Sequence, residues 1–247
     1  MKKRFLNFGL LLALGLTTAL FNSCGRDDDN NGDTIDNASK ITATNVNNGS
    51  TQIKTVKAIV FWESGNNYES EAIAQAPYLN NGFTLELPAT LQDKYLETID
   101  TDDLEGIFVS DKNFKSCFLE DLRGYNGDDN VIGYFYLEED NENWEHYTSW
   151  IYVDRNVTIK GEVVDDEEQG NFDLTLKKGW NIVYESYIEM ENGIVMDSFT
   201  ISSKKPSGVY FTWNFYDDYD CSSTSVASKS VKNSKSFFSK LKENKKK

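Results

Sequence analysis

The chain has 247 residues, enough for one β domain of ordinary size or two small ones, with 26% charged and 13% aromatic side chains. Its net charge is −15 but is unevenly spread: the last nineteen residues hold eight lysines and one glutamate, whereas residues 24–228 hold 14 basic and 39 acidic side chains. The excess of acidic residues in residues 24–228 repels phosphate backbones, which argues against nucleic acid as a partner.

Residues 1–23 have the organisation of a signal peptide. Three basic residues precede an apolar stretch, Phe5–Phe21, which is too short and too often interrupted for a confident membrane-spanning helix. The sequence FNSC that ends at Cys24 resembles the lipobox of bacterial lipoproteins, in which the cysteine is lipidated and becomes the new N-terminus. The resemblance implies a lipid anchor on Cys24, with each buried CH₂ contributing about 0.8 kcal/mol to membrane binding. Ordinary secretion with an unmodified Cys24 is the alternative.

The residues after Cys24 carry two further export features. Residues 25–29, GRDDD, look like the acidic signal of surface-exposed lipoproteins in Bacteroidota-type Gram-negative bacteria. This resemblance implies an outer-membrane lipoprotein exposed on the cell surface, and a periplasm-facing protein is the alternative. The sequence DTI at residues 33–35 is similar to the short O-glycosylation motif of exported proteins in those bacteria, which makes Thr34 a candidate glycan attachment site.

Residues 24–52 are predicted to be the lipid anchor and a flexible linker. Asp, Asn, Gly, Ser and Thr dominate, and the sparse apolar residues show no period. A linker of this length has a mean reach of about 30 Å. Residues 27–32 match the opening of an EF-hand loop, but Ala38 stands where a bidentate glutamate is required, so we expect no metal there.

Residues 53–228 are predicted to form one all-β domain. Apolar and polar residues alternate, as they do in half-buried strands, over Val56–Trp62, Phe83–Leu87, Ile132–Tyr136, Val157–Val163 and Val209–Phe215. We predict an antiparallel β-sandwich of nine or ten strands with transthyretin- or immunoglobulin-like topology. A lipocalin-like barrel gives the same sequence pattern and is the alternative. Within residues 89–125 the apolar spacing predicts a short helix or a packed loop.

The clearest single unit is a hairpin over residues 172–184. Phe172–Leu176 and Trp180–Tyr184 alternate, and Gly179 can take the positive φ that a short turn needs. We expect the apolar face of the second strand to cover that of the first. This LTLKKGWN hairpin and the strand at residues 81–88 are similar to elements of β-sandwich lipoproteins of Bacteroidota-type bacteria. That group has no settled activity, so the resemblance implies fold and location only.

Cys117 and Cys221 are the cysteines that remain once Cys24 is lipidated. They can form a disulfide in an oxidising compartment, or they can be two separate buried thiols. The chain has a single histidine, His146, and no Cys-x-x-Cys, which is too little for the usual zinc sites. There is also no Gly-x-Ser-x-Gly elbow and no phosphate-binding glycine loop, so we predict His146 to be a surface or strand-end residue and expect no catalysis and no cofactor.

Two segments combine acids with aromatic residues. Trp144 is surrounded by glutamates, and the sequence YDDYD spans residues 216–220. Aromatic rings stack on sugar faces and carboxylates accept sugar hydroxyls, although a polar loop with a hydrophobic anchor has the same composition. The candidate binding residues are Trp144, Tyr216, Asp218, Tyr219 and Asp220.

Residues 229–247 form a basic tail. Its apolar residues fall on one helical face, which predicts either an amphipathic helix that contacts anionic lipid or the acidic body, or a solvated tail.

For the whole chain we expect a membrane-anchored, non-catalytic module that binds a glycan, a surface protein or another envelope component. An accessory glycan hydrolase with paired carboxylates and a purely structural lipoprotein are the alternatives. Two carboxylates about 5–9 Å apart in a cleft would favour the hydrolase, whereas a row of exposed aromatic rings would favour sugar binding.

Overall fold

The structure, a computed structural model, describes residues 38–65, 67–99, 106–141, 144–164, 168–188 and 197–217. The predicted signal peptide and lipid anchor and the basic tail lie outside these ranges, so the predictions for them stay predictions. Within the described ranges no helix is long and apolar enough to cross a membrane. The site residues that also lie outside the described ranges are Cys24, Thr34, Asp218, Tyr219, Asp220 and Cys221.

The described part of the chain is all β, which confirms the predicted fold class. It contains fifteen strands, more than the nine or ten expected, and one short 3-10 helix, η1 (Asp93–Tyr95). The strands are β1 (Lys40–Ala43), β2 (Thr55–Ser64), β3 (Asn67–Pro77), β4 (Phe83–Glu86), β5 (Glu97–Thr98), β6 (Ile107–Val109), β7 (Lys115–Phe118), β8 (Asp121–Tyr125), β9 (Val131–Asn141), β10 (Trp144–Val153), β11 (Val157–Val164), β12 (Glu168–Leu176), β13 (Gly179–Ile188), β14 (Asp197–Ser202) and β15 (Thr212–Asp217).

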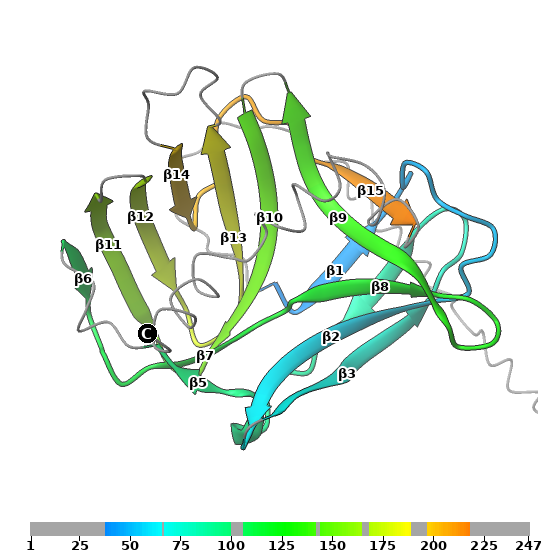
Figure 1. The fold of residues 1–247 in the computed structure, drawn as a ribbon, viewed down its shortest axis with the longest axis horizontal. Helices are drawn as coiled ribbons and strands as arrows, with labels where there is room; N and C mark the ends of the chain where they lie inside the picture. The colour runs from blue at the N-terminus through cyan, green and yellow to red at the C-terminus, as the bar shows by residue number, and fades with distance from the viewer. Residues whose placement is uncertain are drawn as a thin grey trace, which may run out of the picture. The chain divides into compact units, whose positions relative to one another are not determined.

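These strands form two sheets, as a sandwich requires (Figure 1). The smaller pairs β1 with β4, and the larger has thirteen strands along the path β3-β2-β8-β9-β10-β13-β14-β12-β11-β6, with β15 on β9, β7 on β10 and β5 on β7. Among the described strands, β3 and β6 at the two ends of this path each pair with one neighbour. The larger sheet is therefore open rather than closed as in the lipocalin-like alternative. Its pairs are antiparallel except for β12 with β14.

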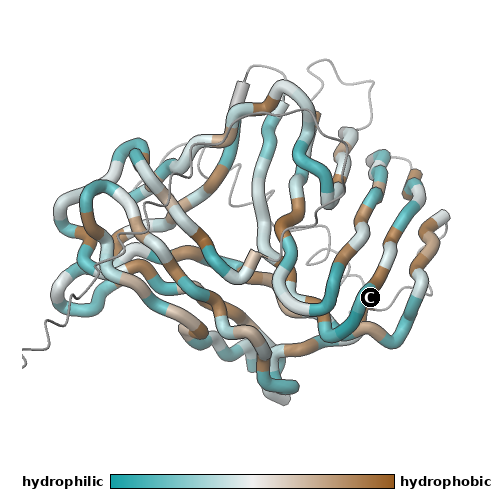
Figure 2. The backbone as a smooth tube through the Cα atoms, turned by 180° about the vertical axis from the view of Figure 1, so that it is seen from behind, coloured by the Kyte–Doolittle hydropathy of each residue, from teal (hydrophilic) through white to brown (hydrophobic). Residues whose placement is uncertain are grey.

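Two hydrophobic cores lie on opposite faces of the larger sheet and meet at β10. Trp150 and Tyr152 belong to the first core, which the small sheet covers, whereas Ile151 and Val153 belong to the second. Four consecutive buried residues show that this end of β10 is covered on both faces. Away from it, Figure 2 shows hydrophobic and hydrophilic residues alternating along many strands, which is the period-two pattern of half-buried strands.

The predicted linker extends too far towards the C-terminus. β1 lies inside the range 24–52, where Ile41 and Ala43 are buried and pair with Leu85 and Phe83 of β4. Residues 38–52 therefore belong to the folded body, and the linker prediction is wrong for them. A four-residue strand is too short to stand out from the polar composition around it, yet its two apolar side chains suffice to cover part of the first core.

The predicted hairpin is wrong in its pairing. Gly179 has the expected positive φ, 103°, and the turn is closed by hydrogen bonds from the Asn181 side chain to the carbonyl oxygens of Lys177 and Gly179. However, β14 lies between β12 and β13, parallel to the first and antiparallel to the second. Phe172–Leu176 consequently packs in the second core, whereas Trp180 packs in the first. The sequence of the predicted hairpin contains no signal that a strand formed by residues 197–202 lies between its two strands.

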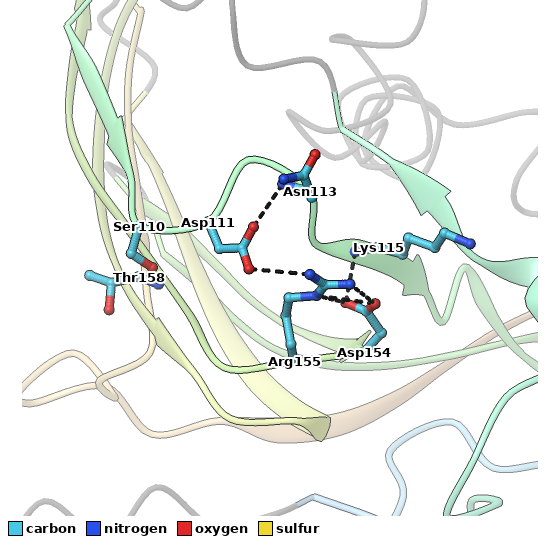
Figure 3. A network of polar contacts seen from close by, with 7 residues as sticks. All are labelled: Ser110, Asp111, Asn113, Lys115, Asp154, Arg155 and Thr158. Carbon is cyan, nitrogen blue, oxygen red and sulfur yellow. Dashed lines mark hydrogen bonds and ion pairs between the residues drawn. The ribbon is translucent and has the colours of Figure 1, made fainter.

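The segment 89–125, expected to be a short helix or packed loop, contains η1 and four short strands, β5 to β8. A polar network attaches its middle to the turn between β10 and β11 (Figure 3). Arg155 lies between two carboxylates, 3.2 Å from Asp111 and 2.9 Å from Asp154. Asp154 also accepts a hydrogen bond of 2.9 Å from the backbone N–H of Lys115. These contacts hold the loop that carries Phe114 into the second core.

We expect Asp154→Asn to lower the free energy of unfolding at neutral pH by about 1 kcal/mol, because a partly solvated charge-assisted pair is lost. Arg155, and then the Lys115 N–H, hold the pKa of Asp154 below its ordinary value of 3.8, against the effect of burial. A lowered pKa stabilises the fold above the ordinary value, and this contribution is lost as the pH falls through the folded-state pKa. Urea unfolding should therefore show the wild type and Asp154→Asn converging in acid.

The matched control is Glu86→Gln, whose carboxylate pairs with Lys40 in solvent and should contribute little at any pH. Equal effects of the two substitutions would contradict the role assigned to Asp154.

Candidate functional site

A cleft lies where β9 changes partners. β15 pairs with Gly133–Glu138 and so occupies one edge of β9. A strand has only two edges, so two strands must share the other edge of β9. There β8 pairs with residues 131–134, and β10 pairs with residues 138–141. β10 in turn pairs with β9 as far as Tyr147 and with β7 from Ile151. Figure 1 shows β9 and β10 side by side at one end and diverging towards β8, and the cleft lies at this junction.

The cleft has a volume of about 100 Å³ and combines aromatic rings with carboxylates. Its aromatic lining residues are Tyr134, Phe135, Tyr136, Tyr147, Trp150 and Tyr187. Its acidic lining residues are Glu120, Asp121 and Glu185, and the lining residues include no lysine or arginine. Asp121 is paired with Arg123 at 2.6 Å, just outside the cleft. The cleft therefore offers ring faces and hydrogen-bond acceptors to a ligand, and it disfavours anions.

Glu185 is a cleft carboxylate that the structure holds in place through both of its oxygens. Its side chain is on β13 directly across from Tyr147 of β10, and only 6% of the residue is exposed. Ser149 donates to one carboxylate oxygen at 2.6 Å, and the Tyr187 hydroxyl donates to the other at 2.7 Å. Each oxygen retains a second lone pair, so the group is positioned and can still accept from a ligand.

Two lining residues carry buried polar atoms that make no hydrogen bond to any part of the chain that the structure describes: Thr148 Oγ1 and Trp150 Nε1. Two other buried indoles do have acceptors, since Trp180 donates to the Pro88 carbonyl at 2.9 Å and Trp213 to that of Thr42 at 3.2 Å. Buried polar groups without a partner are rare in folded proteins. These two lining residues therefore have unused hydrogen-bonding capacity.

Of the predicted binding residues, the structure brings Tyr216 next to the cleft. Its ring packs edge-on against Tyr136, a lining residue, with 5.7 Å between ring centroids. Its hydroxyl donates to the buried carboxylate of Glu138, which also accepts from Asn214 at 3.1 Å. Tyr216 thus supports a lining residue instead of lining the cleft itself.

Trp144, the other predicted binding residue that the structure describes, does not line the cleft. It is 41% exposed and stacks on His146 with ring centroids 5.7 Å apart. His146 is buried, which corrects its prediction as a surface residue, although it does lie near the start of β10. Its Nδ1 is 2.8 Å from the Ser186 hydroxyl. Burial lowers the pKa of His146, and the nearby Glu139 carboxylate opposes this shift.

Cys117 is buried in β7, and its Sγ lies 3.5 Å from the Phe118 carbonyl oxygen. Its predicted partner Cys221 lies outside the described residues, so the disulfide stays a prediction. Within the described part of the chain, no group of three or more His, Cys, Asp or Glu side chains is arranged to hold a metal ion.

The cleft residues themselves are not among the predicted binding residues. Tyr134 and Tyr136 share one face of a predicted strand, and Glu185 and Tyr187 share another face with the same period. This spacing of polar aromatic and acidic residues was the available signal. Comparison with known proteins finds no matching family model, no matching curated protein and no matching solved structure.

Proposed function

We propose that this chain is a non-catalytic glycan-binding module, and that the cleft at the junction of β8, β9 and β10 is its binding site. The observation that carries the proposal is the combination, in one cleft, of tyrosine rings with the positioned carboxylate of Glu185. Aromatic rings present flat apolar faces to the C–H faces of a sugar. A carboxylate accepts hydrogen bonds from hydroxyl groups and makes them about twice as strong as neutral ones.

The charge and size of the cleft restrict the class of ligand that it can bind. Its acidic residues and the absence of basic residues from its lining favour a neutral sugar over a uronic acid or a phosphorylated sugar. Its volume of about 100 Å³ is below the roughly 300–1,000 Å³ of common small-molecule pockets. We therefore expect one sugar unit to enter the cleft, with any longer glycan continuing outside.

The proposal includes the lipid anchor on Cys24, which would place this module on the outer membrane, facing the cell surface. Its partners would then be the membrane, through that anchor, and a glycan of the surroundings. The acidic residues of the chain make nucleic acid an unsuitable partner.

The test is isothermal titration of the full chain with neutral monosaccharides and disaccharides, with glucuronic acid as the anionic comparison. We expect a neutral sugar to bind and the uronic acid not to bind. Tyr147→Ala, which removes a ring from the cleft, should abolish the measurable heat. Tyr68→Ala is the matched control, because Tyr68 is 61% exposed on β3 and outside the cleft.

Equal loss of binding in both variants, or binding of the uronic acid alone, would contradict the proposal. Release of free sugar during incubation with a glycan would favour the hydrolase alternative.

A further inference from the structure

The base of the cleft is apolar except for two hydrogen-bonding groups. Leu119, Leu122 and Phe135 are buried lining residues that also belong to the first core. Two further lining residues carry the hydrogen-bonding groups: the hydroxyl of Thr148 and the indole N–H of Trp150 have no partner in the described part of the chain. An indole N–H can only donate, so the group that satisfies it must be an acceptor.

A second group of lining residues, around Glu185, has the opposite requirement. The hydroxyl groups of Ser149 and Tyr187 already donate to Glu185, and that of Tyr147 donates to Glu145 at 2.8 Å. The carboxylate of Glu185 therefore presents remaining acceptor sites, and its complement in a ligand is an N–H or O–H donor. Because all these residues line one small cleft, a ligand that suits both groups must offer a donor, an acceptor and a small apolar group.

We infer that the sugar taken by the cleft is an N-acetylhexosamine, an inference that rests on the proposed glycan binding and adds its chemical class. An acetamido group carries an N–H donor for Glu185, a carbonyl acceptor for Trp150 or Thr148, and a methyl group for the apolar base. A simple hexose places a hydroxyl where the acetamido group would lie. That hydroxyl lacks the methyl group and leaves the apolar base unfilled.

The inference has a direct spectroscopic test, because an indole N–H gives its own NMR signal and the chain has five tryptophans. The full chain, labelled with ¹⁵N-tryptophan, is titrated with N-acetylglucosamine, N-acetylgalactosamine, glucose and glucosamine. We expect an N-acetylated sugar to bind at least about tenfold more tightly than glucose, the ratio for a lost hydrogen bond together with a lost methyl contact.

The Trp150 signal should move on binding. The signal of Trp180 should stay in place, because its N–H already donates to the Pro88 carbonyl. Trp150→Phe identifies the signal and removes the donor. Thr148→Val removes the other donor with little change of shape, and it serves if Trp150→Phe does not fold. In either variant we expect the preference for the N-acetylated sugar over glucose to fall to about twofold or less.

The outcomes separate this inference from the proposed function. Equal binding of glucose and N-acetylglucosamine, or binding that leaves the Trp150 signal unmoved, would overturn the acetamido inference and leave glycan binding intact. Binding of acetamide alone with the affinity of the whole sugar would show that the ring is not recognised and would overturn the inference too. If no sugar bound at all, both proposals would fall.

Discussion

Glu185→Gln is expected to weaken the binding of a neutral sugar by about tenfold to a hundredfold, which is the range for losing hydrogen bonds to a charged acceptor. The substitution keeps the size of the side chain but removes its charge and replaces one acceptor oxygen with a donor. Because Ser149 and Tyr187 both donate to this group, one of these bonds must reverse in the variant, with the amide N–H donating to a hydroxyl oxygen. Isothermal titration of the full chain measures the change.

Glu145→Gln is the control for this experiment. Its carboxylate also accepts from a tyrosine, Tyr147, but Glu145 does not line the cleft. The control should retain sugar affinity within about twofold, since no cleft acceptor is lost. Thermal denaturation of both variants checks that the fold is kept. Full sugar affinity in Glu185→Gln would show that binding does not depend on Glu185 and would contradict its central role in the proposed site.

The second large effect concerns stability. Trp180→Ala is expected to lower the free energy of unfolding by about 3–5 kcal/mol, which is the usual range for truncating a large buried aromatic side chain. Trp180 is 1% exposed, its ring meets Tyr152 edge-on at 5.5 Å, and its indole donates to the Pro88 carbonyl. Its own carbonyl accepts from the N–H of Ala38 at 3.2 Å. The residue therefore joins β13 to two segments that cover the first core.

Urea unfolding measures this loss, and Tyr210→Ala is the comparison because Tyr210 is 78% exposed. That substitution should change the free energy of unfolding by no more than about 0.5 kcal/mol. A loss below 1 kcal/mol for Trp180→Ala would mean that the first core does not depend on this contact.

The fold class was predictable because its signal is local. In β2 the alternation of Val56, Ala58, Val60 and Trp62 with other residues predicts one buried face. All four residues are buried in the structure. Pairing was not predictable in the same way. Nothing within the sequence of β12 and β13 shows that β14, from residues 197–202, separates them. A strand pairing is decided by competition between distant segments for the same backbone groups, so a short window cannot reveal it.

The candidate site shows the same difference between local sequence patterns, which are predictable, and long-range pairing, which is not. The acids beside Trp144 and Tyr216 in the chain predict binding residues, yet Trp144 stacks on His146 and Tyr216 packs edge-on against Tyr136. The cleft instead gathers residues from four separate segments, 119–122, 134–137, 147–150 and 185–187. The acids within these segments do not stand out in a chain that contains 40. Only the change of partners along β9 brings them together, and that change is a property of the whole sheet.

The place of β1 in the folded body alters how far the module could extend from a bilayer. With Cys24 as the proposed point of attachment, the predicted linker can extend only to Ala38 instead of to residue 52, which leaves about half the length that composition predicts. A chain of that length has a mean span of about 20 Å. The proposed sugar site would then operate close to the lipid headgroups, among membrane-proximal saccharides and below the outer reaches of a surface coat.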